Sequence, residues 1–204
     1  MSRTRLAALA PGTALAGLAL FQPWLEQRMF THMVVELPLL FLVGWWLAPA
    51  RLGQGPAWLR CLNAGGLPGL TLALAVSTVW MLPLALDAAV LEPVVGWLKV
   101  ASVVLSGWLV RLSFRATHPV VQGFFVINWA WMTATAGVLY QEAPARLCST
   151  YLRGDQTWTG IGLVVLAFAV IAVWMTLAFG TGQGAMSQDG VAEGKPPSLQ
   201  ARSA

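Results

Sequence analysis

The sequence predicts an all-α fold, a polytopic membrane protein built as a helical bundle of about six transmembrane helices. Two observations lead to this prediction. Of 204 residues, 57% are hydrophobic and only 10% are charged, whereas soluble domains carry about 25% charged residues. The mean hydropathy is +0.69, and the apolar residues gather in runs of about twenty, the length that crosses roughly 30 Å of hydrocarbon.

Six apolar segments approach this length. They lie near residues 6–24, 29–49, 67–86, 94–110, 120–140 and 158–179. The connections at 51–68, 87–93, 111–119 and 142–155 carry the proline, glycine or charged residues expected of loops. The segments form one expected transmembrane domain, 1–180. Residues 181–204 are rich in glycine, serine, glutamine and charge, so we expect a disordered cytoplasmic tail.

The first segment, 6–24, has two interpretations. Arg3 and Arg5 precede its apolar run, as in a signal peptide. Pro11 and Pro23 interrupt the small-residue stretches where cleavage would occur, so we expect a retained helix. Cleavage would leave the orientation of the other five segments unchanged.

Lysine and arginine residues near the segment ends predict the orientation, because cytoplasmic loops are enriched in them. One side carries Arg3, Arg5, Arg51, Arg60, Arg111, Arg115, Lys195 and Arg202. The other side carries Arg28, Arg146 and Arg153. The first side is therefore expected to be cytoplasmic, with both termini inside. The loop acids fall on the outer side, where they would attract small cations.

The segment 29–49 contains the most informative residues, His32 and Glu36. Ionisable groups inside a span cost on the order of 2.5–3.5 kcal/mol on insertion scales, so they usually face a bundle interior and serve a function. Spacings of three, four and seven place Met29, His32, Met33 and Glu36 on one helix face. Imidazole and thioether groups suit Cu(I), whereas imidazole and carboxylate groups suit Cu(II).

Two other interpretations of this face remain open. His32 and Glu36 could form a buried hydrogen bond between packed helices, with the methionines as ordinary core residues. Alternatively, the histidine and the glutamate could relay protons.

Other residues could join this face in an outward-facing chamber. Met81 precedes Pro83 in the outer part of the third segment and, taken by itself, is a core residue. Lys99 either extends its ammonium to the outer surface or pairs with Asp87, Glu92 or Glu36. Asp87 and Asp155 are most simply solvated loop acids whose shared side of the membrane suggests collection of cations.

Several function classes find no support in the sequence. The chain has no glycine-rich phosphate loop, no Cys-x-x-Cys pair and no Gly-x-Ser-x-Gly elbow. Its basic residues are scattered singly, a pattern that does not indicate nucleic-acid binding. No nucleophile–base pairing or full metal-ligand set is evident, so we do not expect an enzyme.

Three sequence blocks together resemble the CtaG-type cytochrome c oxidase assembly factors. The family's His-Met-x-x-His block is matched by His32-Met33-Val34-Val35-Glu36, followed by a proline-containing apolar helix. Its Trp-His-Leu-Pro and Leu-Tyr-Asp-Ala-Ala blocks are matched by Trp80-Met81-Leu82-Pro83 and Leu84-Ala85-Leu86-Asp87-Ala88-Ala89. Its Asp-Gln pair with a following glycine is matched by Asp155-Gln156 and Gly160. The blocks cover most of residues 28–180.

The chain also departs from the family pattern. Glu36 and Met81 stand where the family has histidines, a further His-x-x-Glu-His block is absent, and Lys99 occupies that neighbourhood. The chain is one span shorter than the usual seven. These changes suit either a site retuned toward Cu(I) or a relative that binds no metal. An ammonium at Lys99 favours the second, because it opposes a bound cation.

The resemblance implies an accessory factor that helps deliver or hold copper for a haem–copper oxidase on the periplasmic side of a bacterial inner membrane. Met29, His32, Met33 and Met81 would coordinate the metal, and Glu36 would balance charge or act as a ligand. The expected partners are membrane lipid and either a terminal oxidase subunit or a periplasmic copper chaperone. The alternatives are a small-ion or proton transport component and a structural subunit of a membrane complex without metal.

Overall fold

The computed structural model describes residues 12–15, 17–18, 20–22, 24–48, 61–63, 65–143 and 153–180. All regular structure in these residues is helical. The elements are η1 (Thr31–Glu36), α2 (Leu37–Leu47), α4 (Leu67–Trp80), α5 (Pro83–Leu91), α6 (Pro93–Ala116), α7 (Pro119–Glu142) and α8 (Arg153–Phe179). The expected tail, 181–204, and much of the first segment, 6–24, lie outside the described residues.

Prolines mark the start of most helices. Pro38, Pro68, Pro83, Pro93 and Pro119 each occupy one of the first two positions of α2, α4, α5, α6 and α7. Proline suits these positions because the first amides of a helix have no intrahelical partner and its fixed φ is already helical. The starts of these five helices thus coincide with prolines.

Two described helices, α6 and the part of α8 from Gly154 to Phe179, are long and apolar enough to cross a membrane. The number becomes three if the bent pair α4 and α5 counts as one span, against the six segments expected from the sequence. The helical stretch Thr31–Leu47 is shorter. The apolar run of α7 is interrupted by Gln122 and Asn128, and α7 does not meet the same criterion.

The apolar segment expected at 67–86 is helical but broken into two helices. The structure ends α4 at Trp80, begins α5 at Pro83 and bends the pair by 76°. Leu82 is extended, with φ −78° and ψ 130°, because a following proline disfavours the helical conformation of the residue before it.

The segment 29–49 is not a uniform α-helix either. Residues Thr31–Glu36 form a π-helix, in which the Leu37 amide donates to the carbonyl of His32. Pro38 has no amide hydrogen to offer the Val34 carbonyl four residues earlier, so a regular α-helical ladder cannot pass through it. Short π-helical turns are frequent at functional sites.

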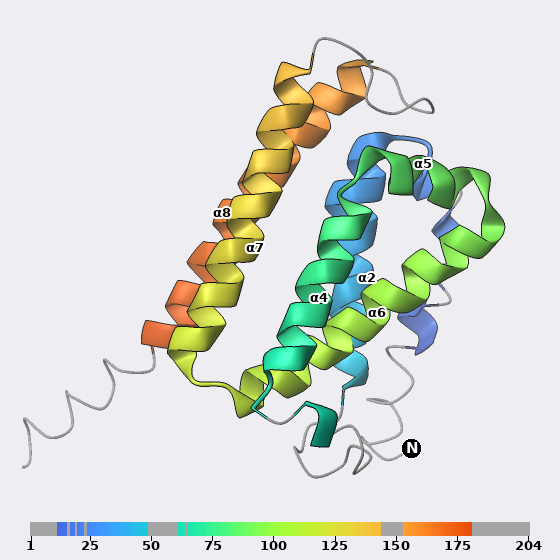
Figure 1. Ribbon diagram of the computed structural model, residues 1–204. Helices are drawn as coiled ribbons and strands as arrows, with labels where there is room; N and C mark the ends of the chain where they lie inside the picture. Colours follow the sequence, from blue (N-terminus) through green and yellow to red (C-terminus); the bar gives the residue numbers. More distant parts are fainter. Residues whose placement is uncertain are drawn as a thin grey trace, which may run out of the picture.

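The helices pack in two groups (Figure 1). The long helices α7 and α8 form an antiparallel hairpin, and α2, α4 and α6 lie together beside it, with α5 across their upper end. Glycines allow two close crossings. Gly137 and Gly160 bring α7 against α8, and Gly44 and Gly107 bring α2 against α6. Small residues serve this purpose where lipid replaces water and burial gives little drive for helices to associate.

Large apolar side chains cover the outside of the helices. Leu84, Val120 and Trp131 are 83%, 73% and 73% exposed, and many other leucines, valines and aromatic residues are also exposed. Soluble monomers seldom expose contiguous apolar surface on this scale. The exposed apolar helices indicate association with a membrane.

The α2–α6 crossing yields a first prediction. In Gly44→Ala the new Cβ would overlap the backbone carbonyl of Val104, and overpacking of this kind costs about 1–3 kcal/mol. We expect a lower melting temperature, measured by circular dichroism in detergent. The control is Gly154→Ala, where a Cβ meets open space and alanine suits a helix better than glycine. If Gly44→Ala and Gly154→Ala lowered the melting temperature equally, the close contact between α2 and α6 at Gly44 would be contradicted.

Candidate functional site: a buried lysine among two glutamates and a histidine

Lys99 lies at the centre of a buried charged cluster. Its side chain on α6 is completely buried. The Nζ atom donates to Oε1 of Glu26 and to Oε1 of Glu36, both at 2.7 Å. Nε2 of His32 lies 3.4 Å from the same nitrogen. We call Glu26, His32, Glu36 and Lys99 the charged cluster.

Local structure brings these four side chains together. His32 and Glu36 come from the π-helical turn η1, where Nδ1 of His32 lies 3.8 Å from Oε2 of Glu36. Glu26 lies in the turn before η1 and accepts a hydrogen bond from Gln22 Nε2 at 2.9 Å. The glycine crossing of α2 and α6 brings the helix that carries Lys99 close to the chain that carries Glu36.

The electrostatic balance of the charged cluster is uneven. Two carboxylates surround one ammonium, so with both ionised and a neutral imidazole the group carries one net negative charge. Glu36 is 2% exposed, and its Oε2 has no hydrogen-bond partner among the described residues. Buried ion pairs often stabilise a fold no better than apolar residues would, because removing charges from water is expensive. The charged cluster is therefore a candidate for function.

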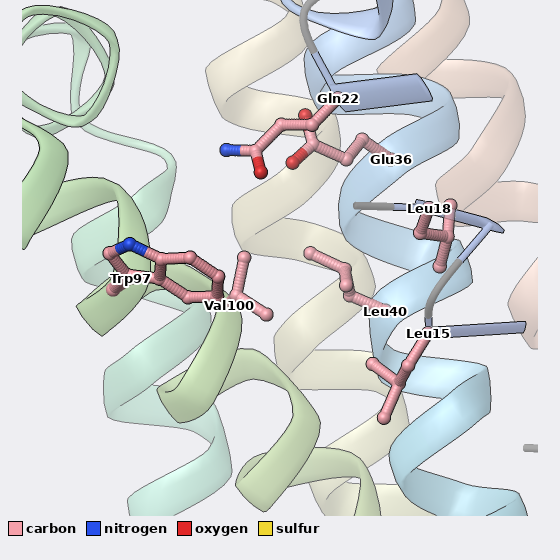
Figure 2. Close-up of a pocket in the computed structure, with 7 residues that line it drawn as sticks. All are labelled: Leu15, Leu18, Gln22, Glu36, Leu40, Trp97 and Val100. Carbon is pink, nitrogen blue, oxygen red and sulfur yellow. The ribbon is translucent and has the colours of Figure 1, made fainter. Parts of the chain in front are cut away.

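A small cavity adjoins Glu36 (Figure 2). Glu36 and Gln22 lie close together at its polar end, and the remaining lining comes from Leu15, Leu18, Leu40, Trp97 and Val100. Its volume of about 20 Å³ is enough for roughly one water molecule. The cavity thus gives the carboxyl group of Glu36 a polar neighbour and room for one small ligand.

The methionines form a second, separate group. Met29 and Met33 are buried in a cluster with Leu86, Tyr140 and Leu163, and Met81 packs against this cluster. From the sequence we expected these thioethers to share a pocket with His32 and Glu36. Instead the described contacts direct the charged side chains of η1 to Lys99. Met29 and Met33 pack in the apolar cluster, and the sulfur of Met81 accepts a hydrogen bond from Thr133 Oγ1 at 3.7 Å. We call Met29, Met33 and Met81 the thioether cluster.

Tyr140 of α7 connects the parts of the thioether cluster. Its hydroxyl donates to the Met81 carbonyl at 2.6 Å, where α4 ends. Its own carbonyl accepts from Gln156 Nε2 of α8 at 2.9 Å. Its ring belongs to the group that holds Met29 and Met33. Residues from all three of the sequence blocks therefore meet at one tyrosine.

Asp87 and Asp155 are not among the described hydrogen-bond partners of Lys99. Asp87 is partly buried on α5, and Asp155 is partly buried in the first turn of α8. The described hydrogen-bond partners of Lys99 are Glu26, Glu36 and His32. Among the alternatives for Lys99, the structure thus has pairing with Glu36, not extension to the surface.

Glu26 is the site residue that sequence reasoning missed, since it was counted only among the acids expected on the outer side. The available signal was its position six residues before His32. The turn that folds it back onto Lys99 is not apparent in the sequence, because no periodic pattern spans it.

Glu26, His32 and Glu36 each offer a ligand atom, and these atoms lie within 4.8 Å of one another. In this arrangement the Lys99 ammonium lies among them. Comparisons with protein-family models, with curated proteins and with solved structures gave no match to this chain.

The charged cluster predicts a ranking of stabilities. Lys99→Met leaves the buried carboxylate of Glu36 and the partly buried carboxylate of Glu26 without their cation. Loss of one partner from a buried ion pair costs about 3–5 kcal/mol. Glu36→Gln should cost less, because Lys99 keeps Glu26 and the net charge falls to zero. The matched control Glu142→Gln, at an exposed position, should change nothing measurable. Thermal unfolding in detergent would measure the order, and a Lys99→Met protein as stable as the control would refute it.

Proposed function

We propose that this chain is a membrane-embedded accessory factor for the assembly of a haem–copper terminal oxidase, and that it holds Cu(I) through the thioether cluster. In this proposal the chain crosses a bacterial inner membrane six times, with both termini in the cytoplasm. The partner would be an oxidase subunit or a periplasmic copper chaperone. The chemistry would be ligand exchange, with no substrate turned over.

The observation that supports this proposal is the convergence at Tyr140. The three blocks that resemble the assembly-factor family are far apart in the sequence. Met33 from the first and Leu86 from the second lie in one buried group with Tyr140, and Gln156 from the third bonds to the Tyr140 carbonyl. A shared centre is what a common function of the three blocks requires.

The thioether cluster suits Cu(I) better than the charged cluster does. Thioether sulfur is a soft, neutral ligand that selects Cu(I). The ligand atoms of His32 and Glu36 face the Lys99 ammonium, which repels a second cation at that place. The proposal therefore assigns Cu(I) to Met29, Met33 and Met81, and leaves His32 and Glu36 outside the coordination shell.

Cu(I) binding by the purified protein tests this assignment. In competition with a chromogenic chelator, we expect wild type to bind one Cu(I) per chain. A variant with leucine at 29, 33 and 81 should lose at least about tenfold in affinity, because leucine keeps the volume but removes the soft ligand. Met175→Leu is the control, since Met175 is 45% exposed on α8.

Two results would oppose the proposal. Equal Cu(I) affinity of wild type and the triple leucine variant would remove the copper part. If the full-length protein also failed to co-purify with oxidase subunits from its own membrane, the assembly role would fall as well. If wild type bound no Cu(I) and the triple leucine variant still co-purified with oxidase subunits, the results would instead support a structural subunit without metal.

A second candidate function, transport of protons or a small ion, is favoured by the buried charged cluster, because intramembrane ionisable groups commonly mark such pathways. Glu36→Gln should then abolish proton or ion flux into liposomes that contain the protein, and Glu142→Gln should leave the flux unchanged. Flux that is absent from wild-type liposomes would refute this candidate.

A further inference from the structure

We propose that Lys99 takes the place of a metal ion, so that its ammonium is a tethered cation in a Glu26–His32–Glu36 site that would otherwise bind a divalent cation such as Zn²⁺. This inference concerns the charged cluster alone. It is independent of the thioether cluster on which the copper proposal rests, so either can fail without the other.

The geometry around Nζ resembles a coordination shell. Two carboxylate oxygens lie at 2.7 Å and an imidazole nitrogen at 3.4 Å from one cationic atom. Zinc takes the same ligand types at about 2.0–2.2 Å. The carboxylate oxygens would need to move inward by about 0.6 Å and the imidazole nitrogen by about 1.3 Å. Three converging ligands of this kind are typical of zinc sites that keep one position open.

The orientation of His32 also suits a metal ligand. Nε2 faces the cation, and Nδ1 faces Oε2 of Glu36 at 3.8 Å. In the tautomer with the proton on Nδ1, the Nε2 lone pair is directed at the cation and the N–H at a carboxylate. Metal-ligating histidines commonly have a carboxylate on their other nitrogen. Here Nδ1 and Oε2 of Glu36 would have to approach each other from 3.8 Å to form that hydrogen bond.

A fourth ligand could come from the cavity beside Glu36. The cavity has room for about one water molecule and is lined by Glu36 and Gln22 at its polar end. Oε2 of Glu36 is buried without a hydrogen-bond partner among the described residues, so a polar ligand would satisfy it. The three protein ligands plus one water give the coordination number of four that zinc favours.

The site is also reachable from outside. The Glu26 side chain keeps 16% of its surface exposed, whereas that of Lys99 has none. An ion could therefore reach the cluster past Glu26 once the lysine is removed. In the native chain the ammonium belongs to the protein itself, so in this proposal the cluster does not depend on metal supply and is closed to other cations.

The test replaces the tethered cation with an apolar chain of similar length. In Lys99→Met, prepared and purified with Zn²⁺, we expect one tightly bound zinc per chain and a melting temperature that rises with zinc concentration. Wild type, which carries the same exposed surface ligands, should show neither effect. Zinc content after dialysis and thermal unfolding in detergent would measure both.

Two double variants test the ligands. Lys99→Met with His32→Ala, and Lys99→Met with Glu36→Gln, should each bind zinc at least about tenfold more weakly than Lys99→Met. The second also removes a buried carboxylate, so it should fold without zinc and serves as the folding control. Their weaker binding would identify the imidazole and the carboxylate as ligands.

Three results would overturn the inference. The first is a folded Lys99→Met protein that binds zinc no more tightly than wild type. The second is zinc affinity that is undiminished in the double variants. The third is a Lys99→Met protein that cannot be recovered even with zinc present, because the metal is expected to replace the missing charge.

Discussion

The fold around η1 depends on one buried ammonium. Lys99 is fully enclosed in an apolar helical protein, where an unpaired charge would be costly. Its partners come from the turn at Glu26 and from Glu36 at the end of the π-helical turn. The need to neutralise Lys99 therefore fixes how the chain before residue 37 lies against α6. If either carboxylate moved away, the remaining charges would be left poorly balanced in a medium that solvates them weakly.

Backbone irregularities make this arrangement possible. A π-helical turn has a wider repeat than an α-helix, and here it ends directly before α2. The same short turn offers His32 and Glu36 to Lys99 and Met33 to a different cluster. The glycine pair Gly44 and Gly107 removes the side chains that would keep α2 and α6 apart. Proline thus shapes the turn that carries His32 and Glu36. The two glycines bring α6, which carries Lys99, close to that turn.

The sequence predicted the features that depend on local chemistry. Long apolar runs indicated α6, α7 and α8, and the rarity of ionisable groups in such runs singled out His32 and Glu36. The break between Met81 and Pro83 and the π-helical turn were missed, although Pro83 and Pro38 were visible, because proline alone does not tell whether a helix kinks, ends or changes repeat. Glu26 and the true partners of Lys99 depend on contacts between distant segments, and no periodicity in a single sequence encodes these contacts.

The separation of the two clusters has a chemical consequence. Soft thioethers bind Cu(I) without needing negative charge, whereas carboxylates with imidazole attract hard and borderline divalent cations. Without a paired lysine, the carboxylates of Glu26 and Glu36 would attract such divalent ions close to the methionines, within the same few turns of chain. The Lys99 ammonium pairs with one oxygen of each carboxylate and would reduce this attraction. A lysine in that position is therefore compatible with handling Cu(I) at the neighbouring methionines, and it opposes metal binding only at the oxygen and nitrogen ligands that it already occupies.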